Sequence, residues 1–142
     1  MRRMSAFAAG LLLGITAAFI PPPTQGIFCF KLDIPMAVKI HQNMTVLNMT
    51  HFGYALNVAE VLHPAKDIAI DCKAVQYAYV ESTGQMDVTK ELADPNSCLS
   101  KLRIADENTT TLQFVWDGTG VTVKDDSKSP KLLPQSGALC PT

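Results

Sequence analysis

The sequence predicts an antiparallel all-β domain, in a sandwich-like or prism-like arrangement of about five to eight short strands held by two disulfides. Apolar and polar residues alternate with a period of two over several segments, which is typical of half-buried strands. Gly, Pro, Asn and Asp separate these segments at turn-like positions. Four cysteines follow a leader-like N-terminus, and an even number in that context predicts a disulfide framework.

Length and composition fit one ordinary domain. The chain has 142 residues, of which 47% are hydrophobic and 18% are charged. This is enough apolar material for a core and too much for a disordered chain. The 12 Lys and Arg nearly balance the 13 Asp and Glu, and no basic block occurs. We therefore expect no nucleic-acid partner.

The N-terminus predicts a signal peptide over residues 1–26. Two arginines precede an uncharged stretch from 6 to 20, which three prolines end. A helix of about fifteen residues rises about 22 Å, less than the roughly 30 Å of a bilayer core. Thr24 and Gly26 provide the small residues that a signal peptidase needs before its cleavage site, and cleavage near Ala18 is the alternative.

Removal of this leader leaves a mature chain of about 116 residues with a mildly acidic charge. We expect a β domain over 27–124, followed by a linker and a disulfide-tethered tail over 125–142. No later stretch reaches the roughly 18 apolar residues of a membrane span, so we expect no transmembrane segment in the mature chain. The expected location is the secretory pathway, either outside the cell or in the endosomal or lysosomal lumen.

The first expected elements are two long strands around a short helix. From Phe30 to Ile40 the even positions are apolar, and Pro35 places this strand at a sheet edge or marks a bulge. Residues 54–62 are expected to form two helical turns before a proline. The second strand, over 67–79, changes phase near Lys73, which a β-bulge explains.

The second half is expected to contain one helical turn and a meander. The turn covers residues 88–93 and is capped by Asp87. Three strands are expected from Leu99 to Lys124, with a hairpin loop at 105–108 and a tight turn at 117–120. The aromatic residues of this half are expected to pack in core strands; they are Tyr77, Tyr79, Phe114 and Trp116.

The four cysteines follow the leader, and none is left over once two disulfides form. They are Cys29, Cys72, Cys98 and Cys140. Their spacing contains no C-x-x-C pair, which argues against a zinc or redox site. Three connectivities are open. Sequential pairing would close two loops of similar size, and the residues alone do not decide among the three.

Three N-x-[ST] motifs predict N-glycan acceptors at Asn43, Asn48 and Asn108. Occupied sites must lie on the surface. Asn43 lies in a polar run with His41 and Gln42, where a glycan would stay clear of the core.

We expect no catalytic residue, no metal and no cofactor. The sequence contains no G-x-S-x-G elbow, no phosphate-binding Gly loop and no H-E-x-x-H motif. Its histidines, His41, His51 and His63, are expected to be solvent-exposed. Met36, Met44 and Met49 beside histidines suggest a copper site, but Met36 lies on the apolar face of an expected strand, which favours packing.

These observations predict a non-catalytic secreted or luminal glycoprotein that acts as an interaction or shielding domain towards a protein or glycan partner. If the two layers splayed apart, inward side chains would line a lipid-sized pocket. A secreted carrier of a small apolar ligand is therefore the alternative, and a small secreted hydrolase is the second alternative.

Two segments begin with a cysteine and continue as alternating strands. They are Cys29-Phe-Lys-Leu-Asp-Ile-Pro-Met-Ala-Val-Lys-Ile40, and Asn96-Ser-Cys98 with Leu102, Ile104 and Thr110-Thr-Leu-Gln-Phe-Val-Trp116. Over residues 29–123 the chain resembles a luminal domain of the lysosome-associated membrane glycoproteins, which is all-β, disulfide-bonded and multiply glycosylated. The resemblance implies that Cys29 pairs with Cys98 and Cys72 with Cys140. Members of the family also end in a membrane helix and a short sorting tail, and neither pattern occurs in this sequence. The resemblance therefore implies a soluble relative or a fragment.

Overall fold

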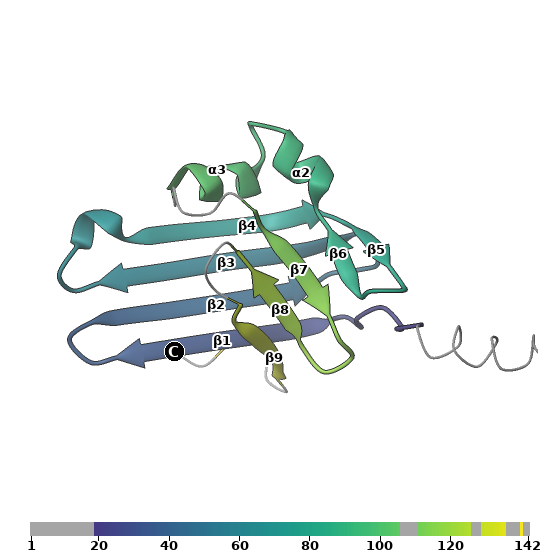
Figure 1. Cartoon of the computed structure of the whole chain (residues 1–142), viewed down its shortest axis with the longest axis horizontal. Helices are drawn as coiled ribbons and strands as arrows, with labels where there is room; N and C mark the ends of the chain where they lie inside the picture. Colours follow the sequence, from purple (N-terminus) through teal and green to yellow (C-terminus); the bar gives the residue numbers. More distant parts are fainter. Residues whose placement is uncertain (1–18, 106–110, 126–128, 136–139, 141–142) are drawn as a thin grey trace, which may run out of the picture.

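The computed structural model describes residues 19–105, 111–125, 129–135 and 140, with the backbone alone for 103–105. Within these residues the chain forms one nine-stranded antiparallel sheet that nearly closes on itself, with the order β4-β3-β2-β1-β9-β8-β7-β6-β5 (Figure 1). The all-β prediction is confirmed, as is the presence of two disulfides. The predicted signal peptide lies outside the described residues as far as residue 18.

The elements run along the chain as β1 (Gly26–Ile34), β2 (Val38–Val46), β3 (His51–Glu60), η1 (Pro64–Lys66), β4 (Ile68–Gln76), β5 (Ala78–Val80), β6 (Gln85–Asp87), α2 (Thr89–Ala93), α3 (Cys98–Ala105), β7 (Gln113–Trp116), β8 (Val121–Lys124) and β9 (Lys131–Gln135). The long strands β1 to β4 form one layer, and the short strands β5 to β9 cross one half of it (Figure 1). Both helices lie beside β4.

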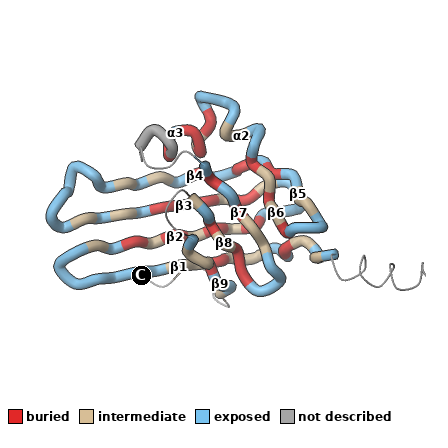
Figure 2. Tube along the Cα trace, in the orientation of Figure 1, coloured by how far each residue is buried: buried red, intermediate tan, exposed pale blue. Residues whose placement is uncertain are grey.

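The core lies between the two layers (Figure 2). Its centre is an aromatic cluster in which Phe114 lies 5.0 Å from Phe52 and 5.2 Å from Tyr54, measured between ring centroids. Tyr77 packs 5.5 Å from Phe52 and is buried. The expected core position of Phe114 and Tyr77 is confirmed, whereas Trp116 and Tyr79 are only partly buried.

The predicted single strand over 30–40 is wrong, because the chain reverses at Pro35 to form the β1–β2 hairpin. The N–H of Ala37 donates to the carbonyl of Ile34 at 3.0 Å, and Ile34 pairs with Val38 across the hairpin. A turn of three residues keeps the even positions on the same face before and after it. The alternation therefore continues through the turn, and periodicity alone cannot detect the reversal.

The segment expected to be helical over 54–62 forms most of β3. Tyr54 and Leu56 of this segment are buried, and Val58 is partly buried against the core. Pairing with β2 and β4 on both sides overrides a weak helical tendency. The bulge predicted near Lys73 is confirmed. Phe52 pairs with Val75 and Tyr54 with Cys72, so one residue of β3 opposes two residues of β4.

The predicted helical turn at 88–93 is confirmed as α2. The predicted cap is wrong, since the N-cap residue is Val88, and Asp87 Oδ1 accepts the N–H of Thr89 at 2.9 Å from one position earlier. The first strand of the predicted meander is wrong, since α3 occupies that segment. Leu99 and Leu102 are both buried, and their spacing of three residues suits one face of a helix. The loop expected at 105–108 lies outside the described residues beyond Ala105.

The later strands follow the prediction more closely. β7 and β8 form a hairpin around residues 117–120, where Asp117 Oδ1 accepts the N–H groups of Thr119 at 2.8 Å and Gly120 at 3.0 Å. The segment expected as a linker and tail contributes β9, which pairs with both β1 and β8 and so joins the two layers. Leu132 of this strand is fully buried.

Candidate functional site

The two disulfides join Cys72 to Cys98 and Cys29 to Cys140. The pairing implied by the family resemblance is therefore wrong, and sequential pairing is also absent. Cys29 lies on β1 and Cys98 lies against β4, three strand positions away in the sheet. Strands are spaced by roughly 4.8 Å, which places the two strands about 14 Å apart and beyond the reach of a disulfide.

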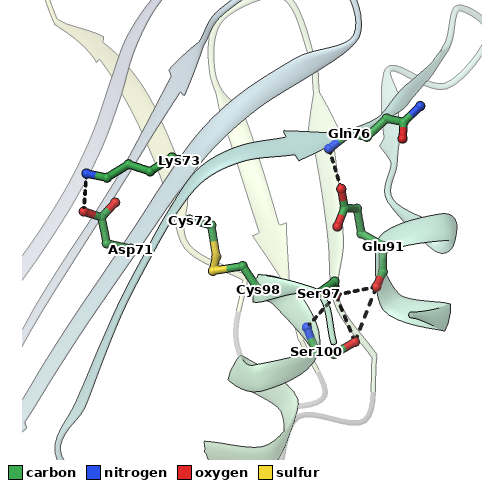
Figure 3. The surroundings of a disulfide bond; sticks show 8 residues. All are labelled: Asp71, Cys72, Lys73, Gln76, Glu91, Ser97, Cys98 and Ser100. Atoms are coloured by element: carbon green, nitrogen blue, oxygen red, sulfur yellow. Dashed lines mark hydrogen bonds and ion pairs between the residues drawn. A yellow bond between two sulfur atoms is a disulfide. The ribbon is translucent and has the colours of Figure 1, made fainter. Parts of the chain in front are cut away.

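The Cys72–Cys98 disulfide lies in a network that fixes the helices to β4 (Figure 3). Glu91 Oε1 accepts the backbone N–H of Gln76 at 2.8 Å, while its carbonyl accepts the hydroxyl of Ser97. Ser97 Oγ in turn accepts the N–H of Ser100 at 3.2 Å. Gln76 is the last residue of the edge strand β4, and its N–H therefore has a partner within the chain.

The predicted glycan acceptor Asn48 is exposed in the β2–β3 turn. Its Oδ1 accepts the N–H groups of Thr50 at 2.9 Å and His51 at 2.8 Å, and also the hydroxyl of Thr50 at 2.9 Å. These bonds do not use Asn48 Nδ2, which is the atom that carries an N-glycan. Asn43 is half-buried on β2 directly opposite Cys29. Asn108 lies outside the described residues.

Four exposed apolar residues lie in the two chain reversals at the end of the long layer that extends beyond the short one, and we call them the tip surface. They are Ile34, Met36, Val61 and Leu62, with exposed fractions of 46%, 87%, 59% and 79%. The N–H of Val61 donates to the carbonyl of Ala37 at 2.9 Å, which ties the turn after β1 to the segment after β3 (Figure 1). Met36 also adopts a positive φ of 63°, uncommon for a residue with a side chain.

The apolar inner face of the long layer extends the core towards the tip surface. Leu32, Ile40, Val58 and Ile68 pair in one register row across β1 to β4. Ile40 is buried, whereas Leu32 is 38% exposed. Gln42 lies in the next register row, and its Oε1 accepts the hydroxyl of Tyr54 at 2.8 Å. Burial raises the pKa of the Tyr54 hydroxyl far above its ordinary value. The buried hydroxyl of Tyr54 therefore has an acceptor within the core.

Sequence reasoning missed the tip surface. The even positions Ile34 and Met36 looked like core residues of one strand, and the signal that distinguishes them is Pro35, which cannot donate to a ladder and so permits a turn. Val61 and Leu62 lie in the segment expected to be helical, although His63 directly precedes Pro64 and a residue before proline is biased away from helix.

The structure does not bring the histidines together. His41 is half-buried on β2, His51 begins β3 with Nδ1 2.8 Å from Thr50 Oγ1, and His63 is exposed beside η1. The three methionines of the copper hypothesis are also dispersed, since Met36 is at the tip, Met44 is in the core and Met49 is in the β2–β3 turn. Among the described residues, no three His, Cys, Asp or Glu side chains gather as metal ligands would.

A shallow pocket of about 220 Å³ lies between β6, α2 and the start of β7. Met86, Val88, Leu92 and Leu112 form its apolar part, and Gln85 and Thr89 are among its polar lining residues. The pocket holds none of the three histidines.

No protein-family model matches the chain, and comparisons with curated proteins and with solved structures return no match. In the portion that the structure describes, no helix has the length and apolar character needed to cross a bilayer.

Proposed function

We propose that the chain is a non-catalytic, N-glycosylated domain of the secretory pathway, outside the cell or in the endosomal or lysosomal lumen, that binds a protein partner through the tip surface. Two disulfides support an oxidising compartment. Because the disulfide pairing departs from that of the lysosome-associated membrane glycoproteins, the proposal does not rest on that resemblance. The separation of the three histidines favours a binding role over catalysis.

The observation that carries the proposal is the position of the tip surface relative to the glycan acceptors. Asn48 lies in the turn at the opposite end of β2 and β3 from the tip. Asn43 shares a sheet face with its partner Cys29, on the side away from the buried neighbours Phe28 and Met44. Glycans on these residues would cover the outer face and the far end and leave the tip accessible. Exposed apolar side chains at one end of the sheet, away from the expected glycans, favour this end as the interaction site.

The contact surface is tested by two charge variants of the secreted protein. Met36→Lys combined with Leu62→Lys is expected to weaken binding of the labelled protein to intact cells of its source by about tenfold or more, because two apolar contacts are replaced by charges. Leu47→Lys combined with Met49→Lys is the matched control, since both residues are exposed at the opposite end. Protease treatment of the cells should abolish wild-type binding if the partner is a protein.

The contact proposal fails if both double variants bind as the wild type does, if both lose binding equally, or if the wild-type protein binds no cell component. Circular dichroism of each variant shows that a loss of binding does not come from unfolding.

Glycosylation is tested at the exposed acceptor. We expect Asn48→Gln and Thr50→Ala to remove the same N-glycan from protein secreted by eukaryotic cells, while Thr50→Ser retains it because serine preserves the motif. The measurement is intact mass before and after enzymatic removal of N-glycans. A wild-type chain that carries no glycan, or that stays inside the cell with reduced cysteines, contradicts the proposed compartment.

A carrier of a small apolar ligand is the second candidate, and the inner-face row of Leu32, Ile40, Val58 and Ile68 favours it. Native mass spectrometry of the secreted protein, together with lipid extraction, distinguishes the two candidates. One molecule of lipid bound per chain supports the carrier, and a ligand-free mass with retained cell binding supports the interaction domain.

A further inference from the structure

Residues 19–25 run against the ends of the second layer, and we call this segment the N-terminal strap. The N–H of Ile20 donates to the carbonyl of Glu81 at 3.0 Å. The hydroxyl of Tyr79 donates to the carbonyl of Ile20 at 2.8 Å, and Trp116 Nε1 donates to the carbonyl of Pro21 at 2.9 Å. The strap is therefore held by hydrogen bonds with β5, with the turn after β5 and with β7.

The strap is also packed. Pro23 is buried, and Ile20 Cδ1 lies 3.5 Å from the position that a Cβ on Gly84 would take. The strap leads directly into β1, whose first residue, Gly26, pairs with Val46. A cut after Gly26 would remove the strap, leave the indole N–H of Trp116 without its acceptor, and place a charged N-terminus at Ile27 inside the β1–β2 ladder.

We propose that the leader is cleaved between Ala18 and Phe19, so that the strap stays in the mature protein as part of the fold. This inference rests on the proposed secretory location. Thr16 and Ala18 are small residues at the third-last and last positions before the cut, as signal peptidases require. Hydrolysis breaks the amide C–N bond of Ala18, and water supplies the hydroxyl of the new Ala18 carboxyl group and a proton to the new amine of Phe19.

The cleavage site is tested by N-terminal sequencing and intact mass of the secreted wild type and two leader variants. We expect the wild type and Gly26→Leu to begin at Phe19, while Ala18→Leu either keeps its leader or begins elsewhere. A Cβ at position 26 would meet only the Thr24 carbonyl oxygen, at 4.0 Å, so we expect this variant to fold. A secreted wild type that begins at Ile27 overturns the inference and leaves the proposed function standing. A chain that is never processed or secreted contradicts the proposed function itself.

The structural role of the strap has a separate readout, because Trp116 is the single tryptophan of the chain. A chain secreted from a foreign leader and beginning at Ile27 is expected to show red-shifted tryptophan emission and a lower Tm than one beginning at Phe19. Tyr79→Phe in the longer chain removes one strap hydrogen bond and should lower its Tm by less than the truncation does. Identical emission and Tm for the two chain lengths would overturn the inference.

Discussion

Two glycines adopt a positive φ, and they differ in whether the structure leaves room for a side chain. Gly84 has a φ of 79° and Gly118 a φ of 95°, and a left-handed backbone costs an ordinary residue roughly 1–2 kcal/mol. They differ in their surroundings. A Cβ on Gly84 would lie 1.8 Å from the carbonyl oxygen of Trp116, whereas a Cβ on Gly118 meets nothing within 4 Å. The N–H of Trp116 donates to the carbonyl of Gly84 at 2.8 Å, which keeps the two backbones together.

We therefore expect Gly84→Ala to lower the free energy of unfolding by about 3 kcal/mol or more, and Gly118→Ala by only about 1 kcal/mol. The difference reports the contact with the Trp116 carbonyl, since both substitutions strain φ in the same way. Urea unfolding of the three proteins gives the comparison. Equal losses for the two variants would mean that Gly84 is not packed against β7.

Asp117 is the residue whose charge most clearly matters to the β7–β8 turn. The Lys131 ammonium, 2.8 Å away, holds the pKa of this carboxyl far below its ordinary value, and hydrogen bonds from Thr119 and Gly120 act in the same direction. A depressed pKa means that the folded state favours the charged form. Its contribution to stability is thus present above the ordinary Asp pKa and is lost as the pH falls through the lowered one.

Asp117→Asn should consequently lower Tm near neutral pH, and the difference from the wild type should shrink as the pH falls below about 4. Because both side chains are partly exposed, salt should weaken the same difference. Thermal unfolding across pH and salt measures it. A difference that is unchanged at acid pH would assign the effect to the shape of the turn and exclude the carboxylate charge.

At the scale of the elements, local pattern predicted the strand content better than it predicted where the chain turns. The bulge at Lys73 was detectable because it shifts the phase of the alternation. The three-residue turn at Pro35 was not, since it preserves the phase. α3 was missed because its apolar residues Leu99, Leu102 and Ile104 fit a strand and a helix about equally over so short a length.

The candidate site was only partly predictable for the same reason. The acceptor Asn48 could be identified from its motif, and the structure adds the hydrogen bonds that occupy its Oδ1. The tip surface depends on which half of the long layer is covered, and this follows from long-range pairings such as β1 with β9. Such pairings join residues more than a hundred positions apart and leave no periodic signal in the sequence.

At the level of the whole molecule, the two disulfides add covalent links to the pairings of the sheet. Cys29–Cys140 closes a loop with a sequence separation of 111, and Cys72–Cys98 closes one of 26. In the chain-entropy model these loops contribute about 4.8 and about 3.5 kcal/mol. The first disulfide joins Cys140 to β1, and the second holds α3 against β4. The cysteine pairing therefore depends on how these distant segments are arranged in the fold.

The most direct test of an oxidised, secreted β domain with this topology is peptide mapping of the non-reduced secreted protein by mass spectrometry. We expect two linked peptide pairs, one containing Cys29 with Cys140 and the other containing Cys72 with Cys98, and no free thiol. A peptide that joins Cys29 to Cys98 or to Cys72, or four cysteines that remain reduced, would contradict it.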